Sequence, residues 1–191
     1  PSLVWSGDAE PLVGKQVLEA GLADRMGPEL ARDFKRSIGA EPVPGAAEKA
    51  GERLLLQIWA RLPENLAIQR LVLTAPVETY QPYRSWLLQA CAELPVQEIA
   101  LVDEPTAAAL GAGLPAGSQL LVVDLGGSTL DLALVSLEGG EGRAAPIAQL
   151  LRLHGHSLGD GSRQKLRTAR VLGKAGLRLG GRDIDRWIVA A

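Results

Sequence analysis

The chain has 191 residues, of which 47% are apolar types, 22% are charged and 4% are aromatic. This balance is typical of a globular chain with a packed core, and the apolar content argues against a disordered chain. No run of about 18 apolar residues occurs, as a membrane-spanning helix would require, so we expect no membrane partner. The single cysteine, Cys91, cannot form an internal disulfide, and no secretory leader is visible, so we expect a cytoplasmic protein.

The net charge of −2 hides an uneven distribution along the chain. Residues 1–117 carry 10 Lys and Arg against 15 Asp and Glu, whereas residues 118–191 carry 10 against 7. The change coincides with the Gly- and Pro-rich segment 113–117, which is typical of a boundary between units. We therefore expect one unit over residues 1–117 and a second over residues 118–191.

Helical periodicity dominates the first third, after a short extended lead. Leu30, Phe34 and Ile38 recur at helical spacing, and Gly39 follows them where a helix can end. The clearest amphipathic pattern runs over residues 46–62 and stops at Pro63. We expect a helix over each of these two stretches.

The middle and last thirds alternate between strand and helix patterns. Apolar runs at 71–73 and 99–102 flank a helical pattern at 83–93, which predicts a βαβ unit with parallel strands. A short helix is expected over 105–112, followed by a hairpin of strands 120–124 and 129–137. We then expect a strand at 147–153, a helix at 162–174, and a last helix from Arg182 with Ile184, Trp187 and Ile188 on one face.

The run Asp124-Leu125-Gly126-Gly127-Ser128-Thr129 is the sharpest chemical feature. An apolar strand delivers a carboxylate at its carboxyl end, and two glycines allow backbone N–H groups to approach an anion. A carboxylate that orders magnesium-bound waters, with amides around phosphate oxygens, is what a magnesium–triphosphate site needs. The alternative is an ordinary Gly-Gly hairpin turn with a capping aspartate.

Three further runs are weak singly: 34–39 around Lys35, 103–110 around Glu104, and 179–185 around Gly180 and Gly181. Each has a structural alternative, namely a solvated helix end, an acidic helix start, and a loop with a cap. In this order, however, the four runs resemble the ATPase domain of the seventy-kilodalton heat-shock chaperones, the DnaK type, within the actin-like ATPase superfamily. The resemblance spans nearly the whole chain.

The resemblance implies an α/β fold of the actin-like ATPase (ribonuclease H-like) kind, present in part, with mixed sheets and flanking helices. Residues 1–117 would be the remainder of the first nucleotide-binding lobe, and residues 118–191 the beginning of the second. The implied cofactors are ATP or ADP with magnesium. By the same resemblance, the catalytic residues would be Lys35, Glu104, Asp124 and Asp131, with Asp124 also on the magnesium; the nucleotide-binding residues Gly126, Gly127, Ser128, Thr129, Gly180 and Gly181; and the interdomain switch Pro76 and Arg84.

The chain also departs from that family pattern. Ser128 replaces a third glycine, Leu130 a phenylalanine, and Asp103 an asparagine beside Glu104, where it adds a like charge. The segment 138–178 is longer and more basic than its counterpart, and neither the first phosphate loop nor the adenosine-binding motifs occur in the sequence. We therefore expect the chain by itself to bind nucleotide weakly or not at all.

The expected function is that of a fragment of a DnaK-type chaperone, in which ATP hydrolysis controls peptide binding by the whole protein. The implied partners are unfolded peptides, a J-domain co-chaperone and a nucleotide-exchange factor; a dimer through an exposed sheet edge is a further expectation. The alternatives are a filament-forming or sugar-kinase-like relative, and a non-enzymatic interaction module. Nucleic acid is not expected, because the basic segment 163–174 contains no aromatic residue for base stacking.

Overall fold

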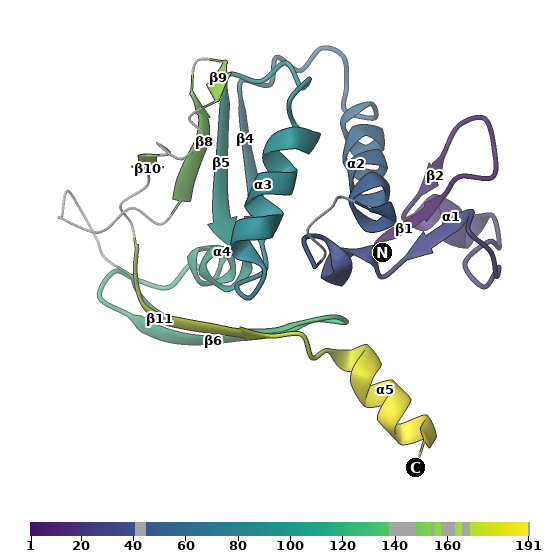
Figure 1. The fold of residues 1–191 in the computed structure, drawn as a ribbon. Helices are drawn as coiled ribbons and strands as arrows, with labels where there is room; N and C mark the ends of the chain where they lie inside the picture. The colour runs from purple at the N-terminus through teal and green to yellow at the C-terminus, as the bar shows by residue number, and fades with distance from the viewer. Residues whose placement is uncertain (41–44, 138–147, 154, 158–162, 166–168, 191) are drawn as a thin grey trace. The chain divides into compact units, whose positions relative to one another are not determined.

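The computed structural model describes residues 1–40, 45–137, 148–153, 155–157, 163–165 and 169–190. The chain divides into two compact units, Pro1–Ala67 and Ile68–Ala191, which follow one another in the colour sequence of Figure 1. This division does not coincide with the segment 113–117, whose role as a boundary between two lobes stays a prediction.

The first unit is built around a small antiparallel sheet. β1 (Leu3–Trp5) lies between β2 (Leu12–Val13) and β3 (Leu30–Arg32). The helical elements are α1 (Lys15–Glu19), the 3-10 helix η1 (Phe34–Ser37) and α2 (Ala46–Trp59). Buried apolar side chains from these elements form the core, which includes Val4, Val17, Leu30, Phe34, Ile38 and Ala50. The helix predicted from residue 46 is confirmed.

The helix predicted over residues 30–38 is wrong. Leu30 pairs with Trp5 across the sheet, so the stretch begins as strand β3 and continues as η1. Asp33 separates the two elements with a left-handed backbone (φ 60°), a conformation that aspartate tolerates better than most residues. Leu30, Phe34 and Ile38 are all buried as the spacing indicated, but strand pairing satisfies the backbone of the first of them.

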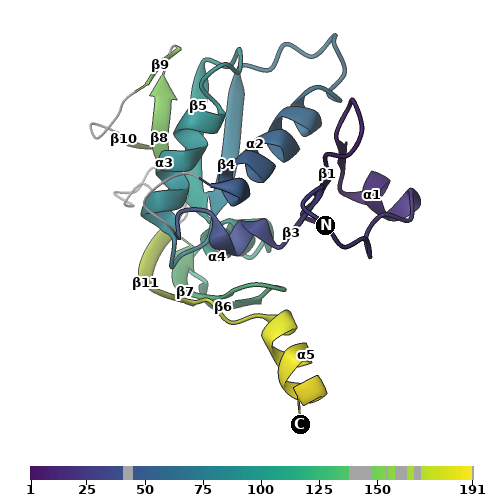
Figure 2. The same ribbon diagram turned by 45° about the vertical axis from the view of Figure 1, so that its right-hand side comes forward.

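The second unit opens with the predicted βαβ motif. β4 (Arg70–Ala75) and β5 (Glu98–Asp103) are parallel and in register over their full lengths, with α3 (Tyr80–Ala90) between them along the chain and beside them in Figures 1 and 2. α4 (Glu104–Gly111) starts directly at the end of β5. β8 (Ala148–Leu153) is antiparallel to β5 and pairs further with β9 (His156–Ser157) and β10 (Arg163–Lys165). The strand predicted at 147–153 is confirmed over 148–153.

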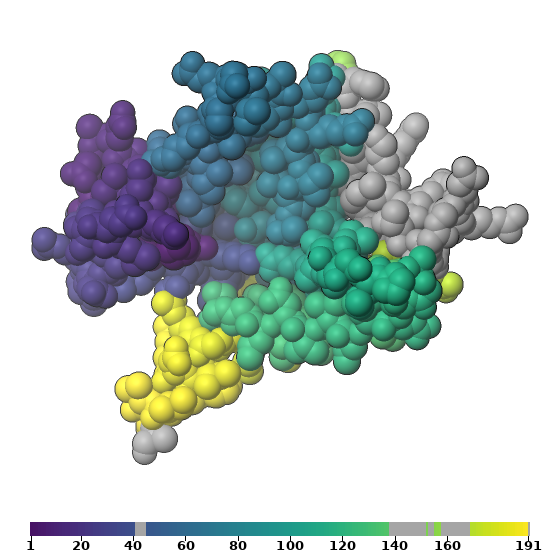
Figure 3. Space-filling model, turned by 180° about the vertical axis from the view of Figure 1, so that it is seen from behind, coloured from purple at the N-terminus to yellow at the C-terminus, as the bar shows by residue number. Residues whose placement is uncertain are grey.

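A second, antiparallel sheet in this unit has the order β11–β7–β6. β6 (Gln119–Leu125) and β7 (Leu130–Leu137) are the predicted hairpin, and β11 spans Ala169–Leu177. One face packs on Ala109 of α4 and forms a buried cluster with Ala133, Val135, Leu137 and Ala169. The other face exposes Leu121, Val123, Leu125 and Leu134. The hairpin forms part of the green surface in Figure 3.

The helix predicted over residues 162–174 is also wrong, because the described part of this segment forms strands β10 and β11. Residues 162 and 166–168 lie outside the described residues. β11 pairs with β7 along its length, from Ala169 opposite Leu137 to Leu177 opposite Leu130, with a bulge between Val171 and Gly173. Long-range pairing with a neighbouring strand therefore overrides the local helical spacing.

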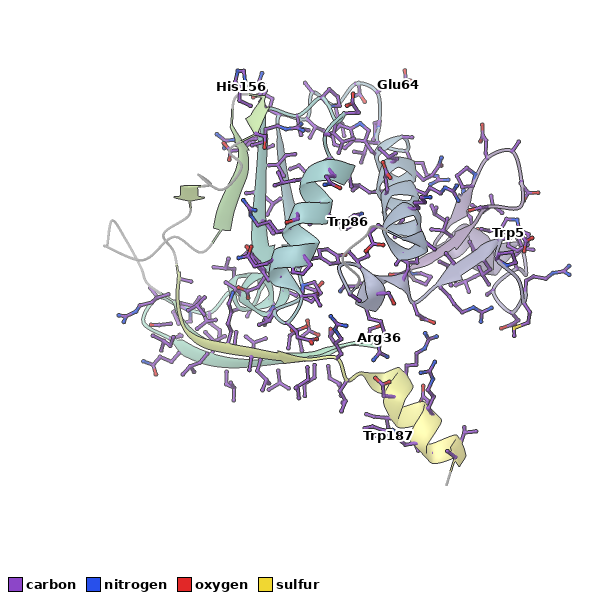
Figure 4. The ribbon with its side chains drawn as sticks, in the orientation of Figure 1. Trp5, Arg36, Glu64, Trp86, His156 and Trp187 are labelled. Carbon is purple, nitrogen blue, oxygen red and sulfur yellow. The ribbon has the colours of Figure 1, made fainter. Side chains whose placement is uncertain are left out.

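The last predicted helix is confirmed as α5 (Gly181–Ala190). Its apolar face is exposed in the described structure; Trp187, labelled in Figure 4, keeps 59% of its surface exposed and Ile188 keeps 70%. Among the helices of the described residues, none combines the length and apolar content needed to cross a bilayer.

Candidate functional site

Two of the predicted catalytic carboxylates lie opposite each other. Asp124, near the end of β6, and Asp131, near the start of β7, are register partners across the hairpin. Side chains of directly opposed residues in an antiparallel pair lie on the same face of the sheet. Asp131 is buried, with 1% exposure, whereas Asp124 is half-buried. The structure therefore brings these two residues together, one inside the unit and one at its surface.

Asp131 is held by only one of its two oxygens. The backbone N–H of Val77 donates to its Oδ1 at 3.0 Å. Its Oδ2 is buried and accepts no hydrogen bond from any described residue. Buried polar atoms are nearly always hydrogen-bonded, so an unsatisfied carboxylate oxygen at this place is suited to accept from a ligand or its bound water.

The two predicted glycine motifs meet at the turn between β6 and β7. Gly126 N–H donates to Thr129 O at 2.9 Å and closes the turn, in which Thr129 is buried. Gly181 N–H donates to Gly126 O at 3.0 Å, and the N–H of Arg182 donates to Gly127 O at 3.2 Å. The amino-terminal end of α5 is therefore joined to the turn by backbone hydrogen bonds.

Gly180 makes the closest approach in this group. A Cβ placed on it would overlap the backbone of Gly127 and Ser128, so only glycine fits there without movement. Its N–H donates to Asp183 Oδ2 at 3.0 Å, which caps the start of α5. Gly180 and Gly181 thus lie against the turn that also carries Gly126, Gly127 and Ser128.

The first turn of α4 places Glu104 beside a buried aspartate. Asp103 is the amino-terminal cap of α4, and its Oδ1 accepts the N–H of Thr106 at 3.0 Å. Its Oδ2 lies 3.2 Å from Lys174 Nζ on β11. The like charge that the sequence places beside Glu104 therefore has a cation of its own. Burial, with the negative charge of Asp103, raises the pKa of Tyr80 to about 12, against a smaller opposing effect of Arg84.

The predicted switch residues both follow β4 along the chain: Pro76 comes directly after the strand, and Arg84 lies within α3. Pro76 is fully buried at the end of β4, and the residue after it, Val77, is the one that donates to Asp131. Arg84 is buried on α3. Its neighbour Tyr83 has a raised pKa, first because of burial and second because of the nearby charge of Glu104. Pro76 thus directly precedes the residue whose N–H binds Asp131. The signalling role of Pro76 and Arg84 stays a prediction.

Lys35 belongs to the first unit, where it is half-buried on η1 beside Arg36, which Figure 4 labels. That Lys35 and Asp124 act in one catalytic site stays a prediction.

The residues at the turn fit a magnesium ion that is bound mostly by water and by substrate phosphates. The described residues contain no cluster of three or more His, Cys, Asp or Glu side chains able to hold a metal. Magnesium, however, usually keeps several waters and binds proteins through one or two carboxylates and the phosphates of its substrate. Half-buried Asp124 and the unsatisfied oxygen of Asp131 fit that kind of binding.

Sequence reasoning missed three contributors: the Val77 backbone, Lys174 and Gly176. Gly176 is the register partner of Asp131 on the neighbouring strand. A Cβ on it would lie 2.7 Å from Asp131 Oδ1 and 2.8 Å from Glu78 N, so the absence of a side chain at residue 176 leaves room for the carboxylate. The usable signal was the alternation of Lys174, Gly176 and Arg178, which indicates a strand that presents every second residue to one neighbour.

Comparisons with known proteins find similarity to two groups of relatives. The model of the MreB/Mbl protein family matches residues 47–146. Heat shock 70 kDa protein 13 of Bos taurus is 34% identical over 104 residues (52% of this chain, 22% of the relative), and the Mus musculus protein of the same name is 29% identical over 176 residues (73% and 37%). Cell shape-determining protein MreB of Escherichia coli (strain K12) is 38% identical over 72 residues (37% and 21%).

The matched region thus spans well under half the length of each of these relatives. The family match covers more than half of the chain and includes β4, β5, α4 and the hairpin with its turn. The chain belongs to the MreB/Mbl family of the actin-like ATPase superfamily and has the actin-like ATPase fold in part.

Proposed function

We propose that the whole protein is a DnaK-type chaperone ATPase, which binds ATP with magnesium and couples its hydrolysis to the binding of unfolded peptides. The observation that carries the proposal is the junction of the 126–129 turn with Gly180 and Gly181 beside the Asp124–Asp131 pair. The similarity to heat shock 70 kDa protein 13 over 73% of the chain supports the chaperone branch. A J-domain co-chaperone and a nucleotide-exchange factor are the partners that this proposal entails.

Each residue has a distinct part in the proposed site. Asp124 orients water on the magnesium ion, and Asp131 accepts through its unsatisfied Oδ2. The turn, with Gly126, Gly127, Ser128 and Thr129, approaches the phosphates with its backbone. When bound, magnesium–ATP would supply the transferable γ-phosphoryl group, and the resemblance to the DnaK type implies that Lys35 is the cation for this group.

ATP turnover by the whole protein tests the proposal. We expect slow hydrolysis, with a loss of about 100-fold in the variants Asp124→Asn and Lys35→Ala, because each removes charge stabilisation from the reacting phosphates. Lys49→Ala is the matched control for Lys35, since Lys49 is an exposed lysine on α2 of the same unit. Unchanged turnover in both site variants would remove the assignment.

A filament-forming actin-like protein is the second candidate. The family match at residues 47–146 and the 38% identity to MreB over 72 residues favour it. Two measurements on the whole protein, each with and without ATP, distinguish the two candidates: sedimentation and peptide binding. ATP-dependent pelleting without peptide binding would favour the filament, and peptide binding that changes with the nucleotide would favour the chaperone.

A third candidate is a non-enzymatic module that keeps the fold and binds a partner. Ser128 in the turn and Asp103 beside Glu104 are the residues that favour it, since both depart from the DnaK-type pattern. A whole protein that binds peptide but neither binds nor hydrolyses ATP would support this candidate over the other two.

A further inference from the structure

Strand β11 presents alternate residues to the carboxyl ends of β4 and β5. Lys174 reaches Asp103 at the end of β5, and Gly176 lies against Asp131 and the Glu78 backbone. Arg178, the next residue in this alternation, lies just beyond the strand, and its Nε is 3.1 Å from Glu78 Oε2. Two ion pairs therefore stand on either side of the glycine that faces Asp131.

The two ion pairs differ in burial. The side chains of Arg178 and Glu78 are 39% and 36% exposed, and such a pair contributes little to stability. The side chain of Asp103 is only 5% exposed, whereas that of Lys174 is 39% exposed. The Lys174 ammonium also lies 4.9 Å from the centre of the Tyr80 ring, within the range of a cation–π interaction. Lys174 is thus the cation that compensates a nearly buried charge.

We infer that Lys174 is a positioning residue of the proposed nucleotide site, acting through Asp103 on the first turn of α4, where Glu104 lies. The inference rests on the proposed function. Asp103 uses one oxygen for the Thr106 N–H and the other for Lys174, so its carboxylate is fixed between the helix and β11. With that orientation fixed, the helix begins in one place, and Glu104 is held with it.

Removal of the ammonium leaves a buried carboxylate with one partner fewer. A carboxylate in that state attracts water or turns toward it, which disturbs the cap and adds uncompensated negative charge beside a site for phosphates. Asparagine at position 103 has no such charge, but its oxygen can still accept the Thr106 N–H. The defect caused by the loss of Lys174 should therefore disappear when Asp103 is also made neutral.

Calorimetric titration of the whole protein with magnesium–ADP tests this inference. The variants are Lys174→Met, Asp103→Asn and their combination, with Arg178→Met as the matched control that removes the other β11-side cation. We expect Lys174→Met to weaken binding about tenfold, a loss of about 1.4 kcal/mol. The double variant should return to within about threefold of the wild type, as should Arg178→Met, since exposed pairs contribute little.

Recovery of affinity in the double variant would distinguish a positioning role of Lys174 from two others, a general effect on stability and a general attraction of the positive charge for phosphate. Three results would each overturn the inference while leaving the proposed function intact. Lys174→Met could bind magnesium–ADP as tightly as the wild type, the double variant could bind no more tightly than Lys174→Met, or Arg178→Met could lose as much affinity as Lys174→Met. No binding by the wild type would overturn the proposed function and this inference with it. If Lys174→Met does not fold, the double variant is compared with Asp103→Asn, and unequal affinities there overturn the inference.

Discussion

Gly180 packs directly on the peptide group of Gly127, with no room between them for a side chain. The contact joins the turn after β6 to the start of α5, although more than fifty residues separate the two along the chain. Because the turn carries the proposed phosphate-binding groups, the shape of the site depends on this glycine.

Gly180→Ala should therefore distort the turn and destabilise the second unit by about 1 to 3 kcal/mol, as overpacking does elsewhere. The control is Gly181→Ala, whose Cβ would lie 3.9 Å from Gly126 O, an ordinary contact. Urea denaturation followed by circular dichroism measures both variants. Equal stabilities of the two would show that the turn yields and that the contact is not restrictive.

Glu48 should make the first unit sensitive to acid. Burial alone would raise the pKa of its carboxyl, but hydrogen bonds from backbone N–H groups, including those of Gly39 and Gly45 at 2.8 Å each, outweigh burial and lower it from 4.5. A lowered pKa in the folded chain means that the stabilisation is present above the unfolded-state value and is lost as the pH falls through the folded-state value.

Glu48→Gln should consequently lower stability at pH 7 by about 1 to 3 kcal/mol, because it weakens two charge-assisted hydrogen bonds. The difference from the wild type should shrink as the pH falls below 4.5. Thermal melts across this pH range measure it, with Glu52→Gln as the control because Glu52 is exposed one turn along α2. A pH-independent difference would contradict the explanation.

Arg152 should be among the most sensitive positions of the second unit. Its buried guanidinium, on β8, donates to the carbonyl oxygens of Cys91, Ala92, Leu94 and Val96 at 2.8, 2.9, 2.8 and 3.3 Å. These carbonyls follow the end of α3, where helix carbonyls lack partners within the helix. Arg152→Met should cost about 3 kcal/mol or more, since several buried acceptors lose their donors together.

The matched control is Arg70→Met. Arg70 bridges the ends of β4 and β5 through Glu98 at 3.7 Å, but its side chain is 73% exposed. Its loss should cost less than about 1 kcal/mol. Denaturant midpoints compare the two variants, and similar costs would mean that Arg152 contributes no more than an exposed ion pair.

Ser128→Gly tests whether this departure from the DnaK-type pattern limits nucleotide binding. A Cβ in the turn takes space near the proposed phosphates, so its removal should tighten magnesium–ADP binding by the whole protein severalfold. Gly127→Ala is the reciprocal change, and a Cβ at Gly127 meets no atom within 4 Å in the folded chain. Unchanged affinity in Ser128→Gly would show that the serine is accommodated without cost.

Much of the second unit could be predicted because its patterns are local. The runs that became β4, β5 and the β6–β7 hairpin are short, apolar and bounded by turn residues, and the helix between β4 and β5 forces parallel pairing. Successive side chains of a strand point to opposite faces of the sheet, and a tight turn joins the two strands. Asp124 and Asp131 therefore lie opposite each other on the same face.

The two wrong helices show where local patterns fail. Residues 30–38 and 162–174 have helical spacing, yet pairing with β1 and β7 respectively draws parts of both into strands. The contacts of Lys174 with Asp103, and of the Val77 N–H with Asp131, join residues 71 and 54 positions apart. No local period encodes contacts of that range, because they depend on how the two sheets pack.

Calorimetric binding of magnesium–ATP to the whole protein, wild type against Asp131→Asn, tests the central claim most directly. Asparagine can still accept the Val77 N–H through its oxygen, so the change replaces chiefly the unsatisfied Oδ2. We predict that the wild type binds with a dissociation constant in the micromolar range or below, and that Asp131→Asn weakens the affinity at least about tenfold. This loss of affinity should occur in the presence of magnesium and not in the presence of EDTA. No binding by the wild type, or equal affinities in the presence of magnesium, would contradict a nucleotide site at this turn.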